Sequence, residues 1–284
     1  MSNDVEIEEL FEKCRNTSGE GVHMAHVYYG DPCEDFSQKL IQTLAENGAD
    51  MIEFGIPFSD PIADGETFQA ACERALKAGI TPRRCIEGIR KLRNTGIIAP
   101  IVVTTYFNIP CVMGFDKFLT RVREAGAQAV LIPDLPFEEA QPFIERTTAH
   151  KLHLILQAAP TTSKKRLEKI IKHASGFLYV IGLEGVTGSM PTDQPTTLEL
   201  VKTIKMTDDV PLMVGFGISR KEQAEVIVSA GADGVAVGSA YARIYSQNLN
   251  NPYDKLPEVA KLASEIKLGC INGYRARKHI KLTT

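Results

Sequence analysis

Eight short apolar segments, separated by longer amphipathic ones, restrict the fold of this 284-residue chain more than any other feature. The apolar segments are rich in branched residues and have the length of strands that are buried on both faces. The segments between them, such as "FSQKLIQTLAENG" and "KEQAEVIVSAG", have the spacing of helices with one apolar face. This alternation predicts βα units around a parallel sheet. The eight predicted strands are residues 22–29, 50–54, 100–106, 129–132, 153–157, 177–181, 211–216 and 234–238.

Residues that commonly begin and end helices agree with this prediction. Ser219 and Glu222 fit the S-x-x-E pattern of a capping box, and Pro82 follows Thr81 just inside a predicted helix. The sequences "ENGAD", "EAGAQ" and "SAGAD" each place a glycine where we expect a helix to end in the left-handed conformation. Their recurrence is typical of an αβ loop used repeatedly.

Eight such units favour a closed (β/α)8 TIM barrel, because an open doubly wound sheet usually has fewer strands and often begins with a GxGxxG turn. No GxGxxG occurs in this sequence. No linker rich in Gly, Ser or Pro divides the chain, so we expect residues 1–284 to form a single domain. We also expect an extra N-terminal helix over roughly residues 3–14 and a last helix over residues 256–280.

Bulk properties exclude several classes of function. The net charge of -3 gives no basic surface for nucleic acid, and no apolar run approaches the ~20 residues that a membrane span needs. The N-terminus is acidic and amphipathic, unlike a signal peptide. The scattered cysteines form no CxxC pair and no metal-ligand pattern, so we expect free thiols, no metal site and a cytoplasmic location. They are Cys14, Cys33, Cys72, Cys85, Cys111 and Cys270.

Glu53 lies within the second apolar segment, near the end of a predicted strand. An ionised carboxylate among packed apolar groups is costly, so it must reach a partner, open into a pocket or take up a proton at a raised pKa. The active sites of these barrels lie at the C-terminal ends of the strands. We therefore interpret Glu53 as a candidate general acid/base, the alternative being a carboxylate paired with a Lys, an Arg or a backbone amide.

The loop after Glu53 contains two further carboxylates. Pro57 and Pro61 stiffen this loop, since each fixes its own φ. Asp60 precedes a proline and Asp64 precedes a glycine, so both also fit ordinary turn residues. The residues alone leave open which aspartate faces a pocket.

Glycines follow the seventh and eighth strands, in "VGFGIS" and "VGSAY". The loops after these two strands commonly bind phosphate in such barrels, and glycine lets backbone N–H groups approach an anion. The candidates are therefore Gly215, Gly217, Gly238 and Ser239. The alternative is that these glycines serve only tight turns.

A long segment rich in glycine and proline, residues 182–197, follows the sixth strand and predicts a lid or another mobile element. The alternative is an insertion without a role. The six histidines form no catalytic pattern with Ser, Cys or Asp, so we interpret them as structural, with His26 as the exception.

The segments "IEFGIPFSDPIADG", "IPDLPFEE", "EGVTG", "VGFGIS" and "VGSA" together resemble the tryptophan synthase alpha subunit family over nearly the whole chain. The resemblance implies a barrel that cleaves indole-3-glycerol phosphate to indole and glyceraldehyde 3-phosphate, without a metal or a cofactor. It implies Glu53 as the acid/base catalyst and Asp64 as the group that binds the indole N–H. One carboxyl that gives and takes protons, with a second fixed carboxylate for the positive charge, suits this reaction.

Further positions are carried over from the family one by one. The resemblance implies that Asp134 marks the surface that faces a beta subunit, to which indole passes. We therefore expect an α2β2 assembly. Asp60 becomes a residue of the loop or of the subunit contact. The implied substrate-binding residues are Tyr179, Tyr106 and Phe216, the lid residue Thr187, and the phosphate ligands Gly188, Gly217, Gly238 and Ser239.

Three segments depart from the family pattern. The family usually has an aromatic residue where "AHVYYGDP" has His26, which this resemblance places near the indole pocket. The segments "TYFNIPCVMG" and "GLEGVTGSM" also differ. The alternative functions are another barrel enzyme acting on sugar phosphates, such as an isomerase or aldolase, and a degenerate barrel that only activates the beta subunit. A Schiff-base aldolase would need a strand lysine, which no predicted strand has.

Overall fold

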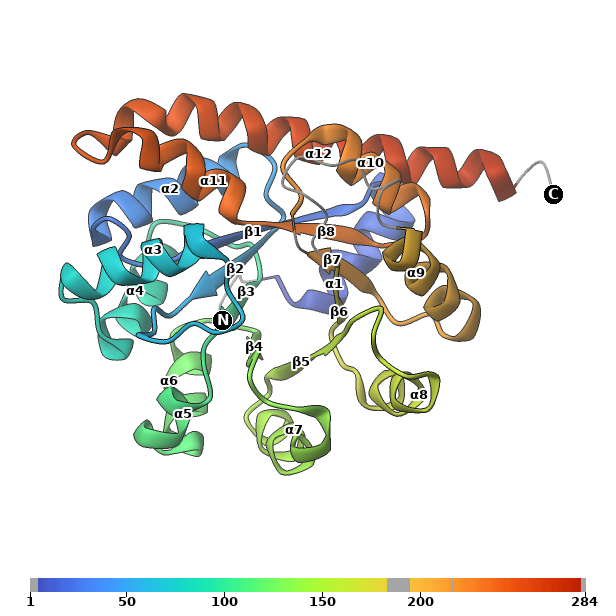
Figure 1. The fold of residues 1–284 in the computed structure, drawn as a ribbon, viewed down its shortest axis with the longest axis horizontal. Coiled ribbons are helices and arrows are strands. Elements are labelled where there is room, and N and C mark those ends of the chain that lie inside the picture. The colour runs from blue at the N-terminus through green and yellow to red at the C-terminus, as the bar shows by residue number, and fades with distance from the viewer. Residues whose placement is uncertain (1–4, 183–194, 216, 282–284) are drawn as a thin grey trace.

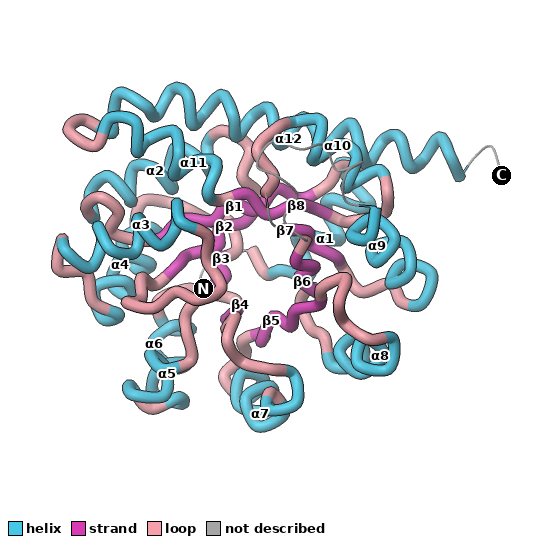
Figure 2. The backbone as a smooth tube through the Cα atoms, in the orientation of Figure 1, coloured by secondary structure: helices cyan, strands magenta, loops and turns pink. Residues whose placement is uncertain are grey.

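The strands form a closed parallel barrel in the computed structural model, which describes residues 5–182, 195–215 and 217–281. Each strand pairs with its neighbours in chain order, and β1 closes the barrel by pairing with β8. Figure 2 shows this ring of strands inside a layer of helices. The predicted (β/α)8 barrel is confirmed, with all eight strands. They are β1 (Val22–Tyr28), β2 (Met51–Gly55), β3 (Ile101–Thr104), β4 (Ala129–Leu131), β5 (His153–Ala158), β6 (Leu178–Ile181), β7 (Leu212–Gly215) and β8 (Gly234–Val237).

Helices cover the outside of the barrel, and the long helix α12 packs along α10, α11 and α2 (Figure 1). Within the described part of the chain, no helix has the length and apolar composition needed to cross a membrane. The covering helices are α2 (Glu34–Glu46), α3 (Glu66–Lys77), α4 (Pro82–Asn94), α5 (Asn108–Met113), α6 (Phe115–Glu124), α7 (Gln141–Ala149), α8 (Lys164–His173), α9 (Pro195–Thr207), α10 (Lys221–Ser229), α11 (Ser239–Tyr245) and α12 (Leu256–Lys281). Short 3-10 turns span Phe137–Glu139, Ser246–Asn248 and Pro252–Lys255.

The extra N-terminal helix is present and covers the end of the barrel where the strands begin. It comprises α1 (Ile7–Glu12) and a π-helical turn (Lys13–Ser18), so its α-helical part is shorter than predicted. The apolar face of α1 packs into the barrel interior, and the rings of Phe11 and Phe177 lie 6.1 Å apart. This end of the barrel is therefore filled with apolar side chains, which leaves the opposite end for chemistry.

The barrel interior changes from apolar to polar along the strands. Alternate residues of a strand point into the barrel. Two positions after an inward apolar residue, the next inward residue of the same strand lies nearer the C-terminal end of the barrel. On β1, Met24 is followed by His26, and on β2, Met51 is followed by Glu53. On β3, Val102 is followed by Thr104. The sequence therefore places polar side chains near the C-terminal ends of three neighbouring strands.

The predicted capping box of Ser219 and Glu222 is wrong by one position. The residue at the N-cap of α10 is Arg220, and Gln223 supplies the reciprocal bond. The Gln223 Oε1 atom accepts hydrogen bonds from the backbone N–H of Ser219 at 2.8 Å and of Arg220 at 3.1 Å. Because the amide oxygen of glutamine satisfies both donors, the helix starts one residue later than the S-x-x-E pattern predicts.

Two other predictions about helix ends are confirmed. The Thr81 hydroxyl accepts a hydrogen bond from the N–H of Arg84 at 3.3 Å, and a proline follows Thr81 as the first helical residue. The glycines of the three recurring helix ends have positive φ, at +103° for Gly48, +103° for Gly126 and +127° for Gly231. A side chain at these positions would strain the backbone.

Candidate active site

Glu53 is a buried carboxyl inside the barrel, with a 3% exposed side chain. Its Oε1 atom accepts a hydrogen bond from the Thr104 hydroxyl at 2.8 Å and lies 3.4 Å from Nδ1 of His26. The Oε2 atom is buried and has no partner among the described residues. Burial raises the pKa of Glu53 to about 7, although the bond from Thr104 acts in the opposite direction. Both protonation states are therefore accessible near neutral pH.

His26 lies between Glu53 and an aromatic cluster. Its ring lies 5.0 Å from the ring of Tyr28 and 4.6 Å from that of Phe68. The absence of a side chain at Gly238 leaves room for this packing, since a Cβ there would lie 2.9 Å from Cβ of His26. Burial lowers the pKa of His26 to about 4, so the imidazole is neutral at pH 7. Its Nε2 atom is buried and has no partner within the described ranges.

Asp64 is held by two tyrosine hydroxyls from different parts of the barrel mouth. Tyr28 at the end of β1 and Tyr106 after β3 each donate a hydrogen bond of 2.6 Å to its Oδ2 atom. The Tyr106 hydroxyl also accepts a bond of 3.0 Å from the N–H of Ala63. The N–H of Asp64 donates to the carbonyl of Pro61 at 2.9 Å, which closes the turn. The carboxylate is therefore fixed from both the loop and the strands.

Asp60, on the same loop, is exposed and has a different surrounding. Its carboxylate accepts a hydrogen bond of 2.5 Å from the neighbouring hydroxyl of Ser59. The structure thus distinguishes the two aspartates, which the residues alone left equivalent: Asp64 faces the ends of the strands, and Asp60 faces the surface.

Tyr179 on β6 belongs to the same cluster of side chains. Burial, and then the negative charges of Glu53 and Asp64, raise the pKa of its phenol well above the usual value. Gly215 on the neighbouring strand β7 makes room for it, because a Cβ at this position would overlap the Tyr179 hydroxyl. The packing thus requires glycine at position 215 whether or not an anion binds there.

The predicted phosphate ligands are only partly described. Gly217 has a φ of +70°, a conformation that favours glycine, and no atom of the described residues lies within 4 Å of where its Cβ would be. Gly238 precedes α11, and Ser239 begins that helix. These positions follow neighbouring strands β7 and β8. The other predicted residues, Thr187, Gly188 and Phe216, lie outside the described residues, as does most of the predicted lid.

Two residues around the carboxylates were missed in the sequence. Thr104 and Tyr28 bond Glu53 and Asp64 directly. Both occupy inward positions at strand ends. The two-residue alternation of a strand could have found them, because Tyr28 comes two positions after His26 on β1 and Thr104 comes two positions after the inward residue Val102 on β3. Within the described ranges, no group of three or more His, Cys, Asp or Glu side chains is placed to hold a metal ion.

A family model decides where this chain belongs. The model described as "Tryptophan synthase alpha chain" matches residues 11–270. The chain belongs to the tryptophan synthase alpha chain family. It is therefore a lyase of tryptophan biosynthesis that cleaves indole-3-glycerol phosphate.

Individual relatives of the tryptophan synthase alpha chain family support this assignment. The chain is 41% identical to the alpha chain of Methanothermobacter thermautotrophicus, over 85% of this chain and 89% of that relative. It is 40% identical to that of Methanosarcina mazei, over 93% and 94%. A crystal structure of the Legionella pneumophila alpha chain has a TM-score of 0.83 at 31% identity, covering 96% of this chain and 98% of that chain. An aminoacrylate-bound tryptophan synthase from Mycobacterium tuberculosis has a TM-score of 0.82 at 29% identity, covering 95% and 100%.

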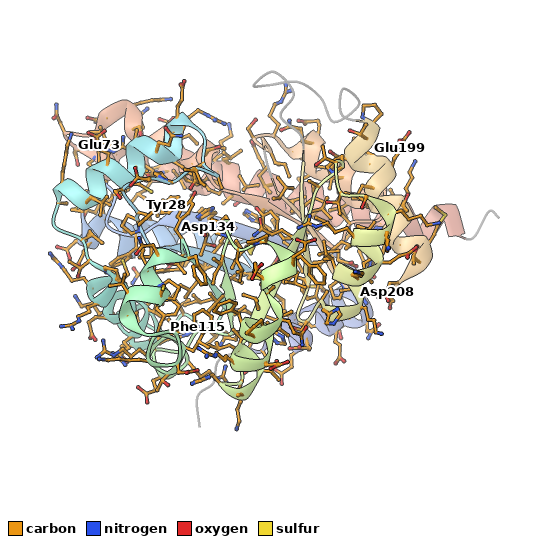
Figure 3. The ribbon with its side chains drawn as sticks, turned by 60° about the horizontal axis from the view of Figure 1, so that its bottom comes forward. Tyr28, Glu73, Phe115, Asp134, Glu199 and Asp208 are labelled. Atoms are coloured by element: carbon orange, nitrogen blue, oxygen red, sulfur yellow. The ribbon has the colours of Figure 1, made fainter. Side chains whose placement is uncertain are left out.

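Asp134, which the resemblance to tryptophan synthase alpha chains assigns to the subunit surface, is exposed in the loop after β4. Its Oδ1 atom accepts a hydrogen bond of 2.9 Å from the N–H of Phe107. This bond joins the loop after β4 to the loop after β3. Figure 3 labels Asp134 together with Tyr28, the tyrosine that binds Asp64.

Proposed function

We propose that Glu53 is the proton carrier of indole-3-glycerol phosphate cleavage and that Asp64 stabilises the positive charge formed on the indole. The observation that carries this proposal is a buried carboxyl with a pKa of about 7 and one unpartnered oxygen inside the barrel. A group with a pKa near the working pH is the most effective at both giving and taking a proton.

The reaction needs two proton transfers, and one carboxyl performs both in this proposal. Protonated Glu53 gives its proton to C3 of the indole, which places a positive charge on the ring nitrogen. The bond between C3 and the glycerol chain then breaks, and the hydroxyl proton of the departing carbon passes to the Glu53 carboxylate. An aldehyde and indole result, and Glu53 is protonated again. Thr104 occupies Oε1, so Oε2 is the oxygen available for both transfers.

Asp64 acts as the fixed negative charge in this scheme. Its carboxylate accepts the indole N–H and offsets the charge that appears when C3 is protonated, and it needs no reorientation because two tyrosines hold it. Tyr179 and Tyr106 line the indole site. Their phenols are neutral because burial raises both pKa values.

Phosphate binding is proposed for the loops after β6, β7 and β8. Backbone N–H groups at helix starts and at glycines in positive-φ turns favour an anion. The residues proposed to bind phosphate are Gly188, Gly217, Gly238 and Ser239, with Phe216 beside the substrate and Thr187 as the lid residue that reaches Asp64.

Members of the alpha chain family work with a beta subunit, and we propose an α2β2 assembly for this chain. Asp134, the exposed loop residue Ile62 and the exposed residue Val112 of α5 would lie on the surface that meets the partner. The cysteines are all free thiols, which fits a reducing cytoplasm as the site of action.

A steady-state assay of indole formation tests the proposed roles. The full chain is incubated with indole-3-glycerol phosphate, with and without a beta subunit, and the Glu53→Gln and Asp64→Asn variants are compared with the wild type. We expect wild-type turnover to rise with the partner and both variants to lose activity in both settings. An active Glu53→Gln variant would remove Glu53 as the proton carrier. A wild-type chain that only activates the beta subunit would support the degenerate-barrel alternative.

A further inference from the structure

We propose that Tyr28 is a positioning residue for the cleavage reaction: with Tyr106, its hydroxyl fixes the Asp64 carboxylate through Oδ2 so that Oδ1 is left for the indole N–H. The inference rests on the proposed role of Asp64, a loop residue, and extends it to a residue of strand β1. Neither the sequence motifs nor the proposed mechanism uses Tyr28.

Both tyrosine hydroxyls bind the same carboxylate oxygen. Tyr28 and Tyr106 each lie 2.6 Å from Oδ2 of Asp64, and each tyrosine is only 1% exposed. No side-chain hydrogen bond reaches Oδ1 within the described part of the chain. Bonds to an ionised acceptor are short and strong, so two of them on one oxygen define the orientation of the carboxylate.

The packing around Tyr28 fixes the position of its hydroxyl before substrate binds. Its ring meets the ring of Phe68 edge-on at 5.1 Å and lies 5.0 Å from that of His26. Gly55 on β2 permits the ring to approach the strand, because a Cβ there would lie 2.6 Å from a ring carbon of Tyr28. Burial, and then the charge of Asp64, raise the pKa of the Tyr28 phenol well above its usual value. The hydroxyl therefore keeps the proton that it donates.

Such positioning acts mainly on the transition state. The positive charge on the indole nitrogen appears only when C3 is protonated, so a carboxylate already in place stabilises that state more than the bound substrate. Loss of one charge-assisted bond commonly corresponds to a factor of about 10 to 100 in an equilibrium or rate constant. We therefore expect the loss of the Tyr28 hydroxyl to lower kcat and to leave KM nearly unchanged.

The test compares three single variants of the full chain, assayed with the beta subunit present. Tyr28→Phe removes the hydroxyl and keeps the ring against His26 and Phe68. Tyr106→Phe removes the second donor. Tyr29→Phe is the matched control, because Tyr29 is the next residue, points to the helix layer and binds Gln38 at 2.9 Å instead of Asp64. Thermal unfolding of each variant separates a loss of folded protein from a loss of turnover.

We expect Tyr28→Phe to lower kcat by about 10-fold or more, with KM within about twofold of wild type. Tyr29→Phe should keep the wild-type kcat even if it unfolds at a lower temperature. The double variant Tyr28→Phe/Tyr106→Phe should approach the kcat of Asp64→Asn and not fall below it, since both tyrosines act through that carboxylate.

A kcat within twofold of wild type for Tyr28→Phe would overturn the inference, as would a rise in KM alone. A double variant slower than Asp64→Asn would show that the tyrosines act on something other than Asp64. The proposed role of Asp64 is tested separately from that of Tyr28, and it is wrong if Asp64→Asn itself keeps the wild-type kcat.

Discussion

Nδ1 of His26 and Oε1 of Glu53 lie 3.4 Å apart on strands that pair these two residues in register. The neutral imidazole also packs against the rings of Tyr28 and Phe68. Nδ1 of His26 and the Thr104 hydroxyl therefore both lie beside Oε1 of the Glu53 carboxyl.

The first prediction concerns the His26 imidazole, whose Nδ1 atom faces Glu53. In His26→Phe, a phenyl ring deepens the desolvation of the Glu53 carboxylate, so the pKa of Glu53 should rise above about 7. Cleavage that needs protonated Glu53 falls as pH rises through that pKa, so the alkaline limb of kcat/KM should move to higher pH. A pH profile of indole formation measures this. An unmoved limb, or one at lower pH, contradicts the prediction.

The second prediction concerns proton transfer. Glu53→Gln keeps the shape and can still accept the Thr104 hydroxyl, but glutamine cannot transfer a proton. Turnover should fall by about 10³-fold or more, while substrate binding should change little. Single-turnover kinetics and calorimetric binding of substrate measure the two effects separately. Loss of binding in step with turnover would indicate a structural role.

The third prediction concerns stability. The pKa of Glu53 is about 7 in the folded protein, above its ordinary value of 4.5. The folded state therefore holds this proton more tightly than the unfolded state, and stability is lost as pH rises from 4.5 through about 7. Glu53→Gln lacks this loss. The free energy of unfolding of Glu53→Gln minus that of wild type should therefore increase over this pH window. At pH values above 7 the total increase should be up to about 3 kcal/mol.

Denaturant unfolding of both proteins at a series of pH values from 5 to 8 measures this difference. Comparing the two proteins cancels the titration of His23, whose pKa burial lowers to about 4. A difference that stays constant across the window would show that Glu53 is not the group with the raised pKa.

The fourth prediction concerns the second carboxylate. Asp64→Asn keeps a group that can accept the indole N–H but removes the negative charge. Because that charge matters most in the transition state, kcat should fall by about 10²-fold or more and KM should change less. The exposed loop residue Asp60 provides the control, since Asp60→Asn should keep the wild-type kcat in the isolated chain. A change in KM alone for Asp64→Asn would contradict the role.

The fifth prediction concerns the space that Gly215 leaves for Tyr179. In Gly215→Ala the new methyl overlaps the Tyr179 hydroxyl, so this side chain must move. We expect a stability loss of about 1–3 kcal/mol and a fall in kcat/KM. The control Gly96→Ala adds a methyl that meets no described atom within 4 Å, at a φ of +92°, so it should lose about 1 kcal/mol through backbone strain and keep full activity. Equal activity in both variants would exclude a role for Tyr179 packing.

The sequence by itself determined the barrel and its order of strands. Apolar runs with inward and outward alternation are local features, as are the glycines that end helices, so both could be read from short segments. Glu53 stood out for the same reason, since a carboxyl within a buried strand conflicts with its neighbours. The start of α10 was misplaced because Gln223 competed locally with Glu222 for the same donors.

Only the tertiary structure decided which groups surround the two carboxylates. Tyr28 and Tyr106 are 36 and 42 positions from Asp64 in the chain, and they meet it because the closed barrel brings the ends of its strands together. The same closure gives Glu53 its burial and therefore its raised pKa. Alternation along a strand shows which side chains point inward, but not which of them meet, since those distances depend on the register of neighbouring strands and on the packing between them.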